Sequence, residues 1–237
     1  MTAMRLKRYP SPSGGFALGK MGVGATMLKQ GKTARDYVQS GLVAMWDGIE
    51  NAGWGAHDAS ATTWKDLTGN GHDIAISTAT FSDDAINISE RSAALTHGFS
   101  TGSIRAIEIS VKERLSGYCI LFFDTRNRIT HYFENGVNGM QFNPDRANSA
   151  VVKSGASTFA ATMDADGMLQ SGYADGRPNP ISNWTRWSGG ENYYLSPRYG
   201  SWTFAGSLRF IRIYDRMPTA DEFAANYAID KERFNLP

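Results

Sequence analysis

The sequence is poor in cysteine and has no long hydrophobic run. Its 237 residues include a single cysteine, Cys119, which excludes an internal disulfide bond. Cys119 lies in an apolar stretch without the electropositive, partly exposed surroundings that activate a catalytic thiol, so we expect a buried core residue. No run of about 18 apolar residues occurs, so a membrane-spanning helix is not expected.

Two further features are absent from the first part of the chain. Residues 1–30 lack the continuous apolar core of a secretory signal, so we expect the protein to stay in the cytoplasm or to leave it by another route. Residues 1–35 contain no acidic residue but seven of the 24 basic residues, whereas the rest of the chain holds all 23 acidic residues. The segment is rich in glycine and shows no strand or helix period. The sequence therefore predicts a basic arm over residues 1–37 and one folded domain over residues 38–237.

The arm is expected to bind a partner through its basic side chains, and a solvated tail is the alternative. The partner could be the acidic body, a neighbouring subunit or a nucleic acid. Nucleic acid is the least favoured because residues 1–35 have only two aromatic residues, Tyr9 and Phe16, and no stacking platform. We expect contacts with other subunits of an oligomeric, multi-protein particle through Arg5, Lys7, Arg8, Lys20 and Lys29.

The body consists of short strand-like stretches separated by turns rich in glycine, asparagine and aspartate. Strands are predicted over residues 42–46, 85–89, 104–111, 118–123, 130–133, 139–142, 150–153, 158–163, 168–173, 193–195 and 207–214. Near the end, Thr219 and Glu222 form a capping box, which predicts one helix whose apolar side includes Phe223 and Tyr227. This pattern is typical of an all-β, antiparallel sandwich with one C-terminal helix.

Three motifs follow one another in the body: Gly41-Leu-Val-Ala-Met-Trp-Asp-Gly48, then Trp64-Lys-Asp-Leu-Thr-Gly-Asn-Gly-His-Asp73, and finally residues 211–222. In this order they resemble the laminin-G-like, concanavalin A-like jelly-roll domains of the bacterial and phage type, over about residues 38–236. The resemblance implies a jelly-roll sandwich that binds carbohydrate or protein without catalysis. Together with the basic arm and the absence of a secretory signal and of a catalytic set, it favours a structural or adhesion component of a phage virion, such as a head decoration, fibre or tail protein. The alternatives are a bacterial cell-surface protein and a free carbohydrate-binding, lectin-like module.

Carboxylate spacing argues against a glycosidase, which is the least favoured hypothesis. Relatives that hydrolyse β-glucans carry Glu-x-Asp-x-x-Glu, whose alternate spacing brings the carboxylates to one face of a strand. This sequence has no such triplet. Its nearest pair on a strand, Glu108 and Glu113, has an odd spacing that sends the side chains to opposite faces of a regular strand.

Two sets of residues remain as candidate binding sites. Oxygen-bearing side chains in neighbouring loops suit Ca²⁺, with capping of turns as the alternative role: Asp47, Asp66, Asn70 and Asp73. No other cofactor is expected. Aromatic side chains in a region rich in glycine and asparagine could offer a sugar-binding platform, with core or interface packing as the alternative: Trp184, Trp187, Tyr194 and Trp202.

Overall fold

The computed structural model describes residues 31–76, 78–88, 94–96, 104–114, 119–123, 127–134, 137–144, 149–152, 155–182, 194–195 and 206–237. Several predicted binding residues lie outside this description: Arg5, Lys7, Arg8, Lys20, Lys29, Trp184, Trp187 and Trp202.

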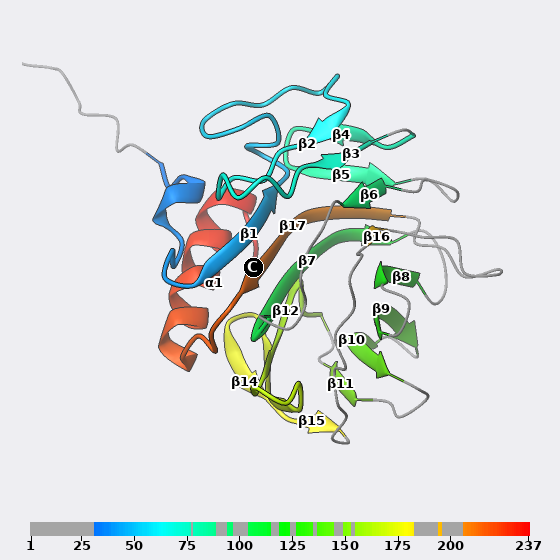
Figure 1. Cartoon of the computed structure of the whole chain (residues 1–237), viewed down its shortest axis with the longest axis vertical. Helices are drawn as coiled ribbons and strands as arrows, with labels where there is room; N and C mark the ends of the chain where they lie inside the picture. Colours follow the sequence, from blue (N-terminus) through cyan, green and yellow to red (C-terminus); the bar gives the residue numbers. More distant parts are fainter. Residues whose placement is uncertain are drawn as a thin grey trace, which may run out of the picture. The chain divides into compact units, whose positions relative to one another are not determined.

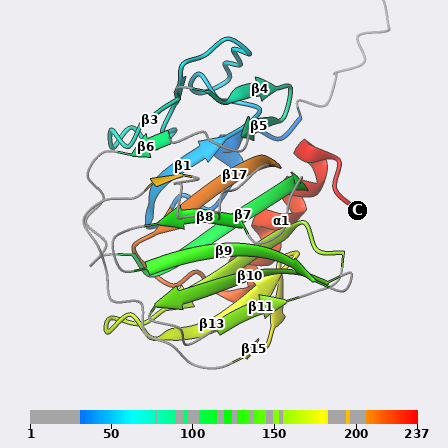
Figure 2. The same cartoon turned by 90° about the vertical axis from the view of Figure 1, so that its right-hand side faces the viewer.

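Two antiparallel sheets stack face to face (Figures 1 and 2). The first sheet contains, in spatial order, β14 (Arg177–Asn179), β13 (Leu169–Ala174), β12 (Thr158–Met163), β7 (Ala106–Arg114), β17 (Gly206–Tyr214), β5 (Ala85–Ile88) and β4 (Thr80–Ser82), with β1 (Leu42–Asp47) also paired to β17. The second contains β15 (Ile181–Ser182), β11 (Ser149–Val152), β10 (Val137–Pro144), β9 (Asn127–Glu134), β8 (Cys119–Phe123), β16 (Tyr194–Leu195), β6 (Ala94–Thr96), β3 (Ile74–Ala75) and β2 (Thr63–Trp64). The predicted all-β sandwich is confirmed.

The central strands β12 and β17 of the first sheet are buried on both faces. Alternate residues of its central strands, such as Ile109 of β7 and Ile211 of β17, pack between the sheets together with Trp64 of the second sheet. The intervening residues face the opposite way and are covered by the helix. β17 is therefore buried along almost its whole length, although it contains Ser207, Arg209 and Arg212.

One helix, α1 (Ala220–Phe234), covers the outer face of the first sheet (Figure 1). The predicted capping box is confirmed: Thr219 accepts from the backbone of Glu222, whose carboxylate accepts from the backbone of Thr219. The helix ends at Asn235, which adopts a left-handed conformation. Phe223 is fully buried and Tyr227 is half-buried, so the predicted apolar side faces the sheet. Within the described residues, no helix combines the length and hydrophobicity that a membrane crossing requires.

The two ends of the body meet in the first sheet, where β1 pairs antiparallel with β17. Residues 31–37 lie on this body: they form a 3-10 turn, η1 (Ala34–Asp36), and Tyr37 is only 2% exposed beneath α1. The folded unit therefore begins at Gly31, and residues 31–37, which the sequence assigned to the basic arm, belong to it.

Candidate functional site

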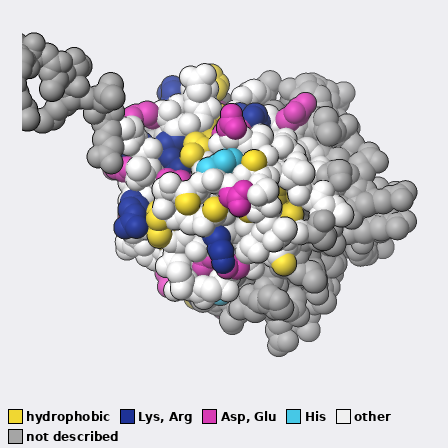
Figure 3. Space-filling view, turned by 90° about the horizontal axis from the view of Figure 1, so that it is seen from above, with side chains coloured by type: hydrophobic (Ala, Val, Ile, Leu, Met, Phe, Trp, Pro, Cys, Tyr) yellow, Lys and Arg dark blue, Asp and Glu magenta, His cyan; other side chains and the backbone are white. Residues whose placement is uncertain are grey.

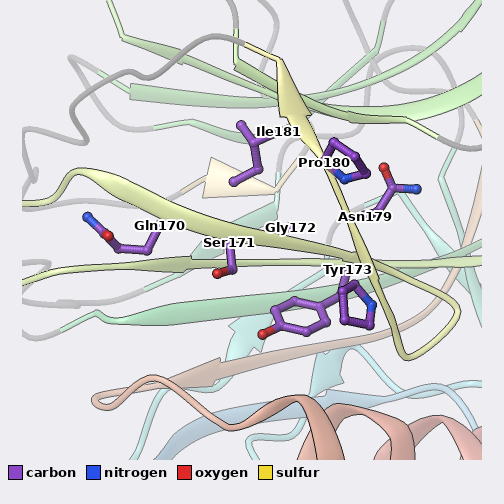
Figure 4. A pocket seen from close by; sticks show the side chains of 8 residues that line it. Gln170, Ser171, Gly172, Tyr173, Asn179, Pro180 and Ile181 are labelled. Carbon is purple, nitrogen blue, oxygen red and sulfur yellow. The ribbon is translucent and has the colours of Figure 1, made fainter.

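A solvent-open hollow lies at one edge of the sandwich, where the chain passes from β14 of the first sheet to β15 of the second (Figure 4). Its volume is about 530 Å³, within the size range of small-molecule sites. The lining combines prolines, one aromatic ring and uncharged polar side chains: Gln170, Ser171, Gly172, Tyr173, Pro178, Asn179, Pro180 and Ile181. Sequence reasoning missed this site.

The hairpin that carries most of the lining is fixed by a tight turn. Asp175 and Gly176 have φ angles of 49° and 69°, so both residues of the loop are left-handed, as in a type I′ turn. A Cβ atom at Gly176 would lie 2.6 Å from Cβ of Tyr227 in α1. Glycine therefore both closes the hairpin and allows it to lie directly against the helix.

Tyr173 joins the hollow to the helix. Its ring centroid lies 4.2 Å from that of Phe223, and only 8% of the residue is exposed. In Figure 4, Ser171 and Tyr173 project from the same side of β13, while Ile181 reaches toward β13 from the crossing strand. The hollow is thus held by a sheet and a helix, which favours a preformed shape.

Three polar side chains of the lining are available to a ligand. Gln170 uses its Nε2 atom to donate to Oδ2 of Asp164 at 2.7 Å and to the carbonyl oxygen of Met168 at 3.3 Å. Its Oε1 atom, and the side chains of Ser171 and Asn179, make no hydrogen bond with the residues described here. The hollow therefore offers one oriented acceptor, one hydroxyl and one complete amide.

A second polar region, a buried charge cluster, lies beneath α1. Its centre is Arg212 of β17, whose side chain is 0% exposed. Arg212 donates to Oε2 of Glu108 at 2.9 Å and to Oδ1 of Asp230, which also accepts from the hydroxyl of Tyr37 at 2.7 Å. Asn226 donates to Glu108 at 3.1 Å. The cluster thus links β7, β17, α1 and the segment before β1.

The cluster perturbs the titration of its members. Burial, reinforced by the charge of Asp230, raises the pKa of Glu108 to about 7 despite the opposing effect of Arg212. Burial also raises the pKa of Asp230. Burial alone would lower the pKa of Arg212, but the carboxylates of Asp230 and Glu108 raise this pKa above its usual range. Shifted pKa values can mark functional sites. However, the side chains of these three residues are at most 1% exposed, so the cluster fastens elements together and does not face a substrate.

Arg233 of α1 extends the buried charge cluster toward the start of the body. Its guanidinium donates to both carboxylate oxygens of Asp47, at 2.6 and 3.1 Å, and to Glu50 at 3.0 Å. Glu50 in turn accepts from the backbone of Ala34 at 2.7 Å. These contacts hold the segment that precedes β1 against both the sheet and the helix.

The structure separates the residues predicted to bind calcium. Asp47 is fully buried and is paired with Arg233, and its Oδ1 atom also accepts from the backbone of Ile49 and of Glu50. The bidentate pairing leaves both of its oxygens engaged by protein donors. Asp47 is therefore part of the buried charge cluster.

The other three predicted calcium ligands lie together in the loop after β2. Asp66 accepts from the backbone of Met45 at 3.1 Å, and Asp73 accepts from the backbone of Asp66 at 2.9 Å. Asn70 donates its amide to the carbonyl oxygen of Val43 at 2.9 Å. Two of these bonds tie the loop to β1, and Asp66 also caps its own turn by accepting from the backbone of Thr68 at 3.0 Å. The four residues do not converge as a set of free oxygen ligands, and calcium binding stays a prediction.

Charged side chains on this end of the molecule are mixed in sign. Figure 3, which views Figure 1 from above, shows acidic, basic and hydrophobic side chains interspersed over the described part of the surface. Among the described residues, no group of three or more histidine, cysteine, aspartate or glutamate side chains is arranged to hold a metal ion.

The remaining predicted residues fall in different places. Glu108 is buried beneath α1 and Glu113 is exposed, so this carboxylate pair does not converge on a common site. Tyr194 lies in the short strand β16, of which the structure describes only the backbone. With Trp184, Trp187 and Trp202 outside the described residues, the aromatic platform stays a prediction.

No protein-family model matches this chain, and no curated protein matches it in sequence. Solved structures match its fold. Domain 4 of AbnA, a GH43 extracellular arabinanase from Geobacillus stearothermophilus, in complex with arabinotriose, has a TM-score of 0.55 at 15% identity over 78% of this chain and 98% of that chain. The binding domain of botulinum neurotoxin serotype D has a TM-score of 0.58 at 8% identity, over 79% of this chain and 51% of that chain.

A Trypanosoma rangeli sialidase in complex with a difluorinated nononic acid also matches, with a TM-score of 0.52 at 15% identity, over 81% of this chain and 33% of that chain. This chain therefore spans less than two thirds of the neurotoxin and sialidase chains but nearly all of the arabinanase domain. At these identities the likeness establishes the fold. The chain folds as a jelly-roll β-sandwich with one C-terminal helix, as the three sequence motifs indicated.

Proposed function

We propose that this protein is a non-enzymatic carbohydrate-binding domain and that the hollow between β13, β14 and β15 is its binding site. The observation that carries the proposal is the lining of the hollow, which sets proline surfaces beside amide and hydroxyl groups. Sugars present C–H faces and hydroxyl groups, which these two kinds of surface complement. The fold likeness to an arabinanase domain in complex with arabinotriose supports the same class of ligand.

The test of this function is a glycan array probed with the full-length chain, followed by titration calorimetry on the best glycan. We expect saturable binding and no release of reducing sugar on prolonged incubation. A blank array would overturn the carbohydrate-binding proposal, and turnover of the bound glycan would overturn its non-enzymatic part. The variants Trp184→Ala and Trp187→Ala test the aromatic set predicted from the sequence, which begins two residues after β15.

We also propose that the sandwich is displayed on a multi-subunit particle, a phage virion in the first instance and a bacterial cell surface in the second. Five basic residues and no acidic residue in segment 1–30 support an anchoring role for that segment, because the rest of the chain carries more acidic than basic residues. In this arrangement the segment binds other subunits and the sandwich remains free to bind surface glycans.

Deletion of residues 1–30 tests the anchoring role and keeps η1 and Tyr37, which belong to the body. We expect the shortened chain to fold and to bind glycans, but no longer to enter the particle. Normal incorporation of the shortened chain would contradict the anchoring role. Loss of folding would contradict the independence of the body from the segment.

A further inference from the structure

We infer that the hollow between β13, β14 and β15 accepts uncharged sugar units and rejects sugars that carry a carboxylate, such as sialic or uronic acids. This inference rests on the carbohydrate-binding function proposed above and specifies its ligand class. Carboxylated and neutral sugars share hydroxyl groups and ring faces. They differ in the carboxylate itself. To bind it, a protein needs a cation, typically an arginine that donates two parallel hydrogen bonds.

Among the described residues, the hollow offers no such cation. None of the eight described residues that line it is charged at neutral pH. A carboxylate placed there would give up its hydration without gaining an ionic partner, at a cost that exceeds that of any neutral hydroxyl group. The composition of the lining therefore selects against acidic sugars without a steric barrier.

The charged residues next to the lining in sequence add to this selection. Asp164 orients the amide of Gln170 and also accepts from two backbone N–H groups of its own turn. Asp175 accepts from the backbone of Ser157 at 2.9 Å and of Thr158 at 3.2 Å. Both are carboxylates outside the lining, so the charge that flanks it in sequence is more negative than positive and disfavours an anionic ligand. Arg177, in β14, is the one basic residue of the hairpin and lies outside the lining.

The polar groups that do line the hollow suit hydroxyl groups. The Oε1 atom of Gln170 is an acceptor whose orientation is set by the two bonds of Nε2. The amide of Asn179 can donate and accept side by side, as a pair of adjacent sugar hydroxyls requires. Pro178, Pro180 and Ile181 supply apolar surface for the C–H face of a ring.

The shape of the hollow is fixed before a ligand binds. Two prolines restrict the backbone where it crosses between the sheets. The turn of the hairpin lies against α1 at Gly176, and the ring of Tyr173 packs on Phe223. A ligand therefore does not need to order a long loop, and loss of single polar contacts should be measurable in its affinity.

The test is an array of paired glycans, each a neutral oligosaccharide and the same oligosaccharide capped with sialic acid or a uronic acid, probed with the full-length chain. We expect binding to neutral members only. By titration calorimetry on the best neutral glycan, Asn179→Ala and Gln170→Ala should each weaken binding about tenfold, since each removes a ligand hydrogen bond. The matched control Arg177→Gln, also in the hairpin but outside the lining, should leave the affinity unchanged. Circular dichroism melts check that all three variants fold.

The outcomes separate this inference from the function on which it rests. Binding to the acidic members, alone or as well as to the neutral ones, would overturn the inference and leave the carbohydrate-binding function standing. The contradiction would be most direct if Arg177→Gln abolished binding to the acidic glycans. Neutral-glycan binding that neither alanine variant weakens would also overturn it, because the sugar would then occupy another surface. An array without any binding overturns the proposed function itself.

Discussion

Two polar regions lie on the same sheet and are built in opposite ways. Beneath α1, charged side chains are buried and paired with one another: Arg212, Arg233, Glu108, Asp230, Asp47 and Glu50. At the edge of the sheet, the hollow is open to solvent, and the described side chains that line it are uncharged. Tyr173 connects the hollow to the helix that covers the cluster, since it lines the hollow and its ring packs on Phe223 of α1.

The difference shows that strong electrostatics alone does not identify a ligand site. The buried charge cluster has strongly shifted pKa values, but its side chains are at most 7% exposed, and it joins β7, β17 and α1 to the segment before β1. The described lining of the hollow carries no charge, but it has available hydrogen-bonding groups and is open to solvent. Within the residues described, the candidate ligand site is therefore the uncharged hollow and not the buried charge cluster.

The largest expected effect comes from removing the central cation of the buried charge cluster. Arg212→Met leaves the carboxyl groups of Glu108 and Asp230 buried without their partner, which should lower the free energy of unfolding by about 3–5 kcal/mol. Urea unfolding measures the change. The matched control is Lys112→Met, because Lys112 pairs with Asp84 at the surface and its loss should cost at most about 1 kcal/mol. If both variants lost the same free energy of unfolding, the distinction between the buried charge cluster and a surface ion pair would be contradicted.

The next effect is a pH dependence of stability that originates from Glu108. Its pKa rises from 4.5 to about 7 on folding, so between these values the folded protein holds a proton that the unfolded chain releases. The free energy of unfolding should therefore fall as the pH rises through this window, by at most about 1.4 kcal/mol per pH unit. The stabilisation is complete below the lower value and lost above the upper one.

Glu108→Gln isolates this contribution, since glutamine resembles the protonated carboxyl group and does not titrate. Urea unfolding of both proteins across the window should show a shallower slope in the variant. An unchanged slope would mean that another group holds the proton. The closest such group is Asp230, whose pKa is also raised by burial.

A smaller effect is expected where the hairpin of the hollow lies against α1. Gly176→Ala forces a methyl group against Tyr227 in α1, whereas Gly155→Ala has the same positive φ but no atom within 4 Å. Overpacking should make the first variant less stable than the second by about 1–3 kcal/mol. Displacement of the hairpin should also weaken glycan binding in the first variant only. Equal stability and equal binding would show that the hairpin does not depend on its contact with the helix.

The smallest effect concerns metal removal. The oxygens of Asp66 and Asp73 already accept hydrogen bonds from the protein, so EDTA should leave the thermal midpoint unchanged. A lower midpoint in EDTA, restored by added CaCl₂ and not by MgCl₂, would instead support the calcium site predicted from the sequence.

The sequence predicted most of the fold because long strands and helix caps leave local signals. β12 has the predicted bounds, and the capping box at Thr219 starts the helix as expected. Strands of two or three residues, such as β2, β3 and β15, were missed because so short a stretch shows no period.

The sites were harder to predict because they depend on packing between distant segments. Arg212 looks like a solvent-facing position of an alternating strand until α1 covers it. A signal does exist in α1, where Asn226 and Asp230 share the helical spacing of the apolar residues Phe223 and Phe234. The hollow leaves only a weak trace, the Asp-Gly pair and the prolines of residues 175–180.

Hydrogen–deuterium exchange of the full-length chain, with and without the best neutral glycan from the array, tests the central claim most directly. We predict that the glycan slows exchange in residues 169–182, which form and flank the hollow, and leaves β17 beneath α1 unchanged. Slower exchange elsewhere in the chain, with no change in residues 169–182, would contradict the assignment of the hollow as the ligand site.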